Sequence, residues 1–120
     1  MVGHIVAALR QSPLVKDVEV MELVEEESVQ FLRAKAEMID GSLLYVRELF
    51  FPNQSKYSYH WQTQTGELLL RWDNAPHHPE LSTFPNHKHE GERVSPSVRV
   101  SIEEVLAELA ARLKRSGQAK

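Results

Sequence analysis

The spacing of apolar residues predicts a short helix near the N-terminus, over residues 2–11. Ile5, Ala8 and Leu9 fall on one side of this segment, as the 3.6-residue period of a helix requires. The pair Ser12-Pro13 ends it, because proline cannot continue a helix and disfavours the helical backbone at the residue before it. A helix this short is marginal unless it packs against the rest of the domain.

A second helix is predicted at the C-terminal end of the chain. Ser101 and Glu104 have the spacing of a capping box, in which each side chain accepts a hydrogen bond from the other residue's backbone N–H. The helix that follows carries one apolar stripe, formed by Ile102, Val105, Leu106, Leu109 and Leu113. Beyond the stripe, residues 116–120 are expected to fray.

Between the two helices the pattern changes to the alternation that is typical of β-strands. Strands are predicted over residues 16–26 and 28–39, and the second of them ends at Asp40-Gly41. This pair is the strongest hairpin signal in the chain, because both central residues of a two-residue type I′ turn need a positive φ. We therefore expect a two-residue turn here, followed by a third strand.

A two-residue turn fixes the pairing of the first hairpin, with Met38 opposite Leu43 and Arg33 opposite Glu48. The apolar face then holds Leu32, Ala34, Ala36, Met38, Leu43, Tyr45 and Leu49. The polar face holds Arg33, Lys35, Glu37, Val46 and Glu48. Arg47 does not fit, since it falls on the apolar face and must extend to the edge of the sheet unless the register shifts.

A second hairpin is predicted in KYSYHWQTQTGELLLRWDN, where two alternating segments flank a turn near Thr65-Gly66. Any loop with an even number of residues gathers one set of apolar side chains on one face: Tyr57, Tyr59, Trp61, Leu68, Leu70 and Trp72. The opposite face then gains His60, Arg71 and Asp73. This face of the hairpin is the first candidate for chemistry.

No periodicity is visible from Asn74 to Ser97, where Pro76, Pro79, Pro85 and Pro96 disfavour regular structure. We expect a long, ordered loop that lies across the sheet. The pattern as a whole predicts an α+β fold in a single domain over residues 1–120. Its mainly antiparallel sheet of about five strands is covered on one face by the C-terminal helix and the short N-terminal helix, and it carries the long His/Pro-rich loop.

Composition limits the function classes. The formal net charge of −3 argues against a protein that holds nucleic acid by overall basic charge alone, although a local basic patch remains compatible with it. Without cysteine there is no disulfide, no thiolate nucleophile and no cysteine zinc site. The N-terminus lacks the pattern of a signal peptide, and no apolar segment reaches the roughly 20 residues of a membrane helix, so we expect a cytoplasmic protein that does not bind membranes.

Histidines mark the candidate catalytic residues. The segment RWDNAPHHPELSTFPNHKH contains four of the six histidines of the chain. Cleavage of RNA by its own 2′-hydroxyl needs a base, an acid and a cation beside the phosphate, and no cofactor. The candidate catalytic residues are His60, Arg71, Asp73, His77, His78, His87 and His89. In this scheme Arg71 holds the phosphate, two histidines transfer protons and Asp73 fixes the tautomer of one of them.

Other residues are candidates for binding the substrate: Arg33, Lys35, Glu48, Phe84 and Lys88, with Phe84 as a platform for a stacked base. Each candidate also has a structural interpretation. Arg71 with Asp73, and Arg33 with Glu48, are compatible with simple ion pairs, and His60 with a half-buried strand position. The dense histidine group on a long loop is harder to explain by structure alone.

A metal site is the alternative for the same histidines. His77-His78 and His87-x-His89, with Asp73 nearby, supply nitrogen and oxygen ligands for zinc or another divalent ion. The spacing is not diagnostic, because adjacent histidines rarely both reach one ion and the helical i, i+4 pair is absent. We therefore rank acid–base chemistry without a metal above a metal-dependent nuclease.

Four strings of the sequence carry a family resemblance: DGSLLYVRELF, YSYHWQ, RWDNAPHH and FPNHKH, in this order. Together they resemble the TumE-like family, small proteins identified as the toxin component of bacterial and archaeal type II toxin–antitoxin modules. The resemblance extends from about Val18 to the final helix. It implies a cytotoxic protein that is neutralised by an antitoxin with a helix-turn-helix DNA-binding domain, and it supplies no catalytic mechanism.

Two further interpretations stay open. A toxin of this kind can act without catalysis, by occupying a target, or the domain can serve mainly to bind a partner protein. Phe50 and Phe51 beside Pro52 are candidates for a docking edge. RNA is the expected target, and a homodimer is left open.

Overall fold

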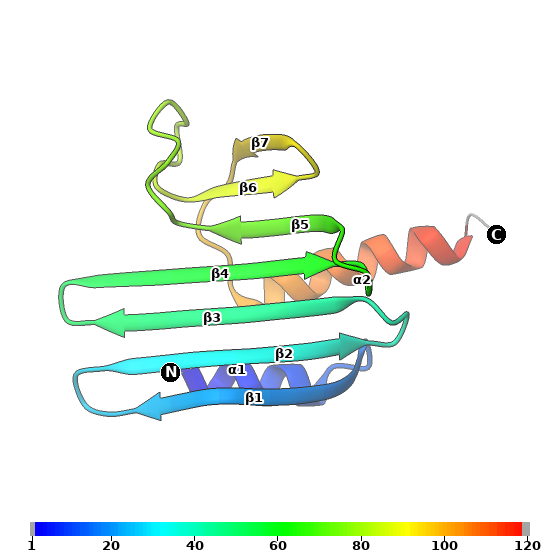
Figure 1. The fold of residues 1–120 in the computed structure, drawn as a ribbon, viewed down its shortest axis with the longest axis horizontal. Coiled ribbons are helices and arrows are strands. Elements are labelled where there is room, and N and C mark those ends of the chain that lie inside the picture. Colours follow the sequence, from blue (N-terminus) through cyan, green and yellow to red (C-terminus); the bar gives the residue numbers. More distant parts are fainter. Residues whose placement is uncertain (1, 119–120) are drawn as a thin grey trace.

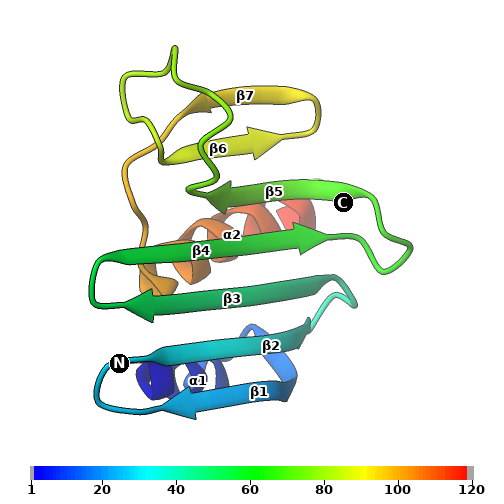
Figure 2. The same cartoon turned by 60° about the vertical axis from the view of Figure 1, so that its left-hand side comes forward.

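A single antiparallel sheet forms the centre of the protein, with two helices on one face of it (Figures 1 and 2). The computed structural model describes residues 2–118, with side chains to residue 114. The elements are α1 (Val2–Gln11), β1 (Val15–Glu25), β2 (Gln30–Met38), β3 (Leu43–Phe51), β4 (Gln54–Gln62), β5 (Leu68–Asp73), β6 (His87–Glu90), β7 (Arg93–Pro96) and α2 (Ile102–Gln118). The α+β class is confirmed. In the described part of the chain, however, the sheet has seven strands rather than about five.

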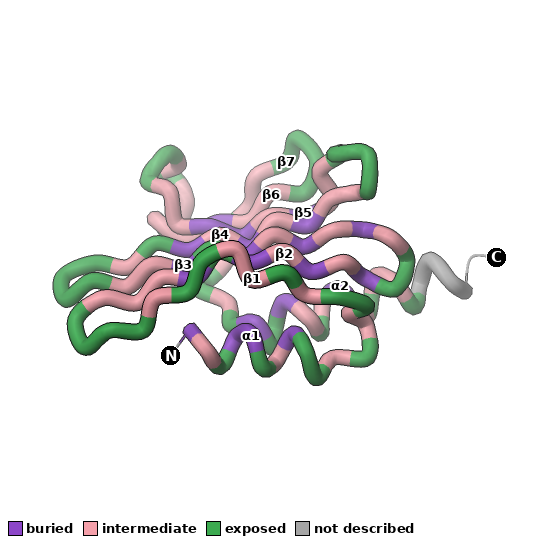
Figure 3. Tube along the Cα trace, turned by 60° about the horizontal axis from the view of Figure 1, so that its bottom comes forward, coloured by how far each residue is buried: buried purple, intermediate pink, exposed green. Residues whose placement is uncertain are grey.

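Each strand pairs with the next one along the chain, so the strand order is β1-β2-β3-β4-β5-β6-β7. Figure 3 shows both helices on the same side of the sheet, as the sequence predicts. Helix α1 buries Val2, Ile5, Val6 and Leu9, and α2 buries Ile102, Val105 and Leu109. We call the opposite face, which neither helix covers, the open face.

The N-terminal end of α2 confirms the predicted capping box. The Ser101 N–H donates to Glu104 Oε1 over 3.0 Å, and the Glu104 N–H donates to Ser101 Oγ over 3.1 Å. The fraying that we expect for residues 116–120 concerns the end of this helix, where side chains beyond residue 114 and all of residues 119 and 120 lie outside the described part. Within the described residues, no helix has the length and apolar content needed to cross a membrane.

The predicted register of the first hairpin is wrong by one residue. Glu37 pairs with Leu43 and Arg33 with Arg47, because the loop has three residues, 39–41, instead of two. In this loop the Gly41 N–H donates to the Met38 carbonyl over 2.9 Å, and Gly41 has a φ of 89°. A three-residue loop that ends in a residue of positive φ is the next most common way to close a hairpin.

A one-residue shift moves every side chain of β3 to the other face of the sheet. Leu44, Val46 and Glu48 are buried on the helix-covered face, whereas Tyr45 and Arg47 lie on the open face. The shift buries two aliphatic side chains and leaves Arg47 in solvent, which removes the conflict that the predicted register contained. It also places Glu48 in the core, where the sequence pattern does not predict it.

The faces of the second hairpin agree with the prediction. The aromatic side chains Tyr57, Tyr59, Trp61 and Trp72 are buried on the helix-covered face, together with Leu70. Register places His60 opposite Arg71 and Ser58 opposite Asp73, so these residues share the open face. A bulge after Trp61 brings Gln62 opposite Leu68, which is only half-buried.

The expectation of a loop through residues 74–97 is wrong for its second half. Strands β6 and β7 form a further hairpin around Gly91, whose φ is 60°. Pro85 precedes this hairpin, and Pro96 lies at the end of β7, the edge strand, where a missing N–H disrupts no ladder. Only residues 74–86 connect β5 to β6, and they project beyond the edge of the sheet in Figure 2.

Candidate functional site

Strand pairing gathers five of the predicted catalytic residues on the open face: His60, Arg71, Asp73, His87 and His89. His60, Arg71 and His89 are direct neighbours across β4, β5 and β6, and Asp73 is opposite His87 one step further along. His78 reaches the same place from the 74–86 connection, where its ring lies 4.9 Å from that of His87. We call this group the Asp73 cluster, which comprises His60, Arg71, Asp73, His78, His87 and His89.

Asp73 is the centre of the cluster and is almost completely buried, with 4% exposed. Its Oδ1 accepts the Ala75 N–H over 2.9 Å and lies 3.0 Å from His87 Nε2. Its Oδ2 accepts Arg71 Nε–H over 2.9 Å and lies 3.5 Å from His89 Nε2. Burial alone raises the pKa of Asp73, but the hydrogen bonds from Ala75 and Arg71 and the charges of His87 and Arg71 outweigh it, so this pKa is lowered. The carboxylate is therefore charged at neutral pH.

The guanidinium of Arg71 is held at two points. Besides its bond to Asp73, its Nη1 donates to His60 Nδ1 over 3.1 Å. Because a guanidinium cannot accept, His60 Nδ1 is the acceptor and His60 Nε2 carries the proton, which it donates to Gln62 Oε1 over 3.1 Å. Burial and then the charge of Arg71 lower the pKa of His60. A neutral His60 with both nitrogens engaged orients Arg71 and is poorly placed to transfer a proton.

The other three histidines differ in their access to solvent. His87 is 2% exposed, and its Nδ1 donates to the Pro85 carbonyl over 2.9 Å. The side chains of His78 and His89 are partly exposed. Burial lowers the pKa of His89; Asp73 opposes this, and the charges of His87, Arg71 and His78 add to it. Of these three histidines, His78 and His89 are therefore the ones that a substrate can reach.

A cavity of about 360 Å³ opens beside the cluster. Its lining includes Arg71, Asp73, Lys56, Arg47 and the exposed His77. The sequence pattern does not identify Arg47 and Lys56 as site residues. The predicted register puts Arg47 on the apolar face, and this conflict is the one sign in the sequence that Arg47 lies elsewhere. Three cationic side chains around one cavity favour a phosphate-bearing ligand.

The remaining candidates are spread over the protein. On the open face, Arg33 pairs with Glu22 over 3.2 Å, and the Lys35 ammonium lies 3.9 Å from Glu19. Phe84 is 45% exposed in the connection between β5 and β6. Lys88 is opposite Trp72 and lies on the helix-covered face. There its ammonium is 5.3 Å from the centre of the Trp72 ring and 3.5 Å from Glu108, away from the cluster.

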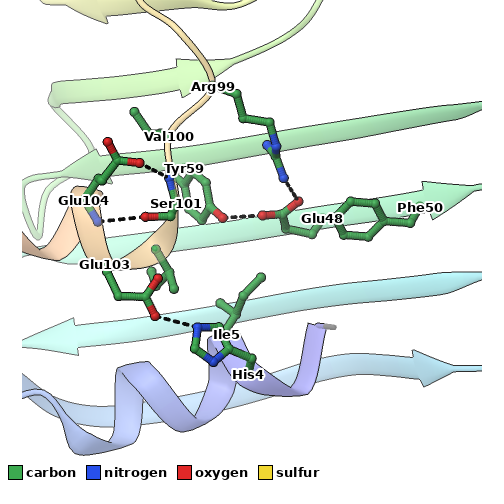
Figure 4. Close-up of a pocket in the computed structure, with 11 residues that line it drawn as sticks. His4, Ile5, Glu48, Phe50, Tyr59, Arg99, Val100, Ser101, Glu103 and Glu104 are labelled. Carbon is green, nitrogen blue, oxygen red and sulfur yellow. Dashed lines mark hydrogen bonds and ion pairs between the residues drawn. The ribbon is translucent and has the colours of Figure 1, made fainter.

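Glu48 is also separated from the cluster by the thickness of the sheet. Figure 4 shows its carboxylate between the Tyr59 hydroxyl, which donates to it, and Arg99, whose Nη2 lies 2.6 Å away. The guanidinium of Arg99 also stacks 4.0 Å from the centre of the Tyr57 ring. Burial, followed by the charge of Glu48, raises the pKa of Tyr59. This group attaches the segment before α2 to the sheet, and no sequence pattern predicts the role of Arg99.

A family model described as Toxin TumE matches residues 5–113, nearly the whole chain. No curated protein and no solved structure matches.

Proposed function

Since the chain belongs to the TumE family of toxins, we propose that it inhibits growth by cleaving RNA at the Asp73 cluster, without a metal ion, and that a helix-turn-helix antitoxin neutralises it. The toxin role follows from the family. The chemistry and the partner are our proposals, and we place both the protein and its target in the cytoplasm.

The observation that supports cleavage most directly is the position of Arg71. Two of its donors are fixed by Asp73 and His60, and the rest of the guanidinium has no partner in the described part of the chain. It lines the cavity that also holds Lys56 and Arg47. A preorganised cation of this kind stabilises the extra negative charge that a phosphate develops during transfer.

The proton transfers are assigned to His78 and His89, which a substrate can reach. One of them takes the proton of the 2′-hydroxyl as its oxygen bonds to phosphorus. The other donates a proton to the 5′-oxygen as the bond from phosphorus to that oxygen breaks. The products are a 2′,3′-cyclic phosphate and a 5′-hydroxyl, so no metal or redox partner is needed.

The other members of the site have supporting roles in this scheme. His87 and Asp73 are buried and orient the reacting histidines, and His60 positions Arg71. His77 lies at the wall of the cavity, where it can contact the ribose or phosphate. Arg33, Lys35 and Phe84 extend the binding surface, the first two by charge and Phe84 by stacking. Lys88 and Glu48 have no role, because they face the helices.

Incubation with total RNA tests the proposal. We expect the purified chain to produce discrete fragments with 5′-hydroxyl ends, at a rate that a chelator such as EDTA does not reduce. Fragments that form only without the chelator would favour the metal-dependent nuclease. RNA that stays intact under both conditions would favour a toxin that acts by binding.

An antitoxin partner is the second expectation. Expression of the isolated chain should arrest bacterial growth, and co-expression of a helix-turn-helix antitoxin encoded beside it should restore growth. Phe51 is 40% exposed and, with Phe50, Pro52 and the β1–β2 turn, it lines a cavity of about 450 Å³ at the far end of β3. This apolar surface is our candidate for the antitoxin contact.

The variant Phe51→Ser separates docking from toxicity. It should still arrest growth, because Phe51 lies outside the Asp73 cluster, but the antitoxin should no longer rescue the cells. Harmless expression of the unaltered chain at a measurable level of folded protein would contradict the toxin mechanism proposed here. If the antitoxin fully restores growth of cells that express Phe51→Ser, the antitoxin binds at another surface.

A further inference from the structure

Three imidazole rings meet at the end of the Asp73 cluster that is formed by β6 and the 74–86 connection. The ring centres are 4.9 Å apart for His78 and His87, 5.8 Å for His78 and His89, and 4.8 Å for His87 and His89. The rings are strongly inclined to one another, at 69° to 77°. One nitrogen from each ring lies within 4.8 Å of the others.

These separations are close to those of ligands around a single ion. A zinc–nitrogen bond is about 2.0–2.1 Å long, so two nitrogens on one tetrahedral ion lie about 3.3–3.4 Å apart. The three donors therefore need to approach one another by about 1.5 Å or less. His78 and His89 are partly exposed and can make this adjustment by rotating their side chains.

The surroundings of His87 are those expected for a metal ligand. Its Nδ1 donates to the Pro85 carbonyl, and its Nε2 points into the cluster, where it lies 3.0 Å from Asp73 Oδ1. A histidine that binds a metal usually donates its second ring N–H in this way. Because His87 is 2% exposed, its ring is already fixed before an ion arrives.

The charges nearby also suit a cation. The Asp73 carboxylate lies within 3.5 Å of both His87 and His89 and adds negative charge beside them. An ion at the three nitrogens would share this carboxylate with Arg71, which already pairs with it.

We propose that His78, His87 and His89 bind one divalent ion of the zinc class beside the Asp73 carboxylate, which lies 3.0 Å from His87 Nε2 and 3.5 Å from His89 Nε2. Neutral imidazoles suit zinc, nickel or cobalt, whereas magnesium and calcium prefer oxygen ligands. Three protein ligands leave at least one coordination position open to water.

Ion binding itself does not depend on RNA cleavage, but its consequence rests on the proposed function. An ion held by His78 and His89 occupies the nitrogens that the metal-free scheme uses for proton transfer. Zinc is therefore a reversible inhibitor of cleavage, and the cluster senses the free zinc concentration.

Equilibrium dialysis of the full chain, purified without a histidine tag, tests the site. We expect one zinc ion per chain and no magnesium bound under the same conditions. Loss of a residue that only hydrogen-bonds to a metal ligand typically weakens metal affinity by about 10- to 100-fold. His78→Gln and His89→Gln each remove a ligand, so each should weaken zinc affinity by more than this. His77→Gln, next to His78 but exposed at the cavity wall, is the matched control and should bind zinc like the unaltered chain.

Melting curves without zinc show whether the variants are folded. If a folded His78→Gln or His89→Gln protein still binds zinc with full affinity, the proposed zinc site is wrong. Equal loss in His77→Gln would overturn it too, because it would indicate scattered binding to surface histidines. The cleavage assay separates the two proposals. If the chain binds zinc normally but never cleaves RNA, the proposed function is wrong and the zinc site stands. If cleavage requires zinc, the ion is catalytic at these three ligands and zinc inhibition is wrong.

Discussion

The variant Arg71→Ala is expected to cleave RNA about 10²- to 10³-fold more slowly than the unaltered chain, which is the usual effect of removing one preorganised donor to a developing negative charge. In the structure this guanidinium is fixed by Asp73 and His60, so its loss removes a cation that needs no rearrangement to act. The measurement is the rate of fragment formation at saturating RNA. Growth of cells that express the variant should recover in parallel.

Two further variants make the Arg71 result interpretable. Arg71→Lys keeps the charge but cannot donate to Asp73 and His60 in the same geometry. Its cleavage rate should therefore lie between those of the unaltered chain and Arg71→Ala. Arg10→Ala removes an exposed arginine from α1, on the other side of the sheet, and should cleave normally. If Arg71→Ala keeps full activity, or if its melting temperature falls enough to leave it unfolded in the assay, the arginine has no demonstrated part in the chemistry.

Replacing Leu109 by Ala should reduce the free energy of unfolding by about 2–5 kcal/mol, the range found for buried leucines. Leu109 is fully buried between α2 and the sheet, so its loss leaves a cavity in the core. Leu106 is at the centre of the predicted stripe as well, but it is only partly buried, so Leu106→Ala should cost less. Denaturant unfolding of each variant gives these free energies.

Lys114→Ala is the control for α2, because this exposed side chain lies on the opposite side of the helix from Val105 and the change should stay within about 0.5 kcal/mol. Glu108 is a poorer control than the sequence pattern indicates, since it pairs with both Lys88 and Arg112. Equal costs at Leu109 and Lys114 would show that α2 does not close the core in solution.

The sequence predicts the two ends of the fold well, because its helix signals are local. Residues 2–11 are helical as the spacing indicates, and the capping box of α2 forms as expected. The first hairpin shows the limit of local reasoning. Asp40-Gly41 is compatible with loops of two or three residues, and the choice depends on which side chains of β3 the core accepts. Arg47 was the only local sign that the longer loop applies.

The candidate site was predictable where it depends on alternation and unpredictable where it depends on pairing over distance. Parity along β4 and β5 is enough to put His60, Arg71 and Asp73 on one face. The positions of His87 and His89 follow from a strand, β6, that four prolines in the surrounding segment conceal. Its pairing with β5 brings both histidines beside Asp73, which local patterns do not reveal.

The order of the strands also determines when the Asp73 cluster is completed during synthesis of the chain. Every strand pairs with the one made just before it, so the sheet can grow strand by strand as the chain leaves the ribosome. His60, Arg71 and Asp73 emerge first, and His87 and His89 join them only when β6 is added. The residues of α2 that seal the core come last. Under the proposed function, a nascent chain is therefore inactive until β6 has been made, and the proposed antitoxin has that interval in which to bind.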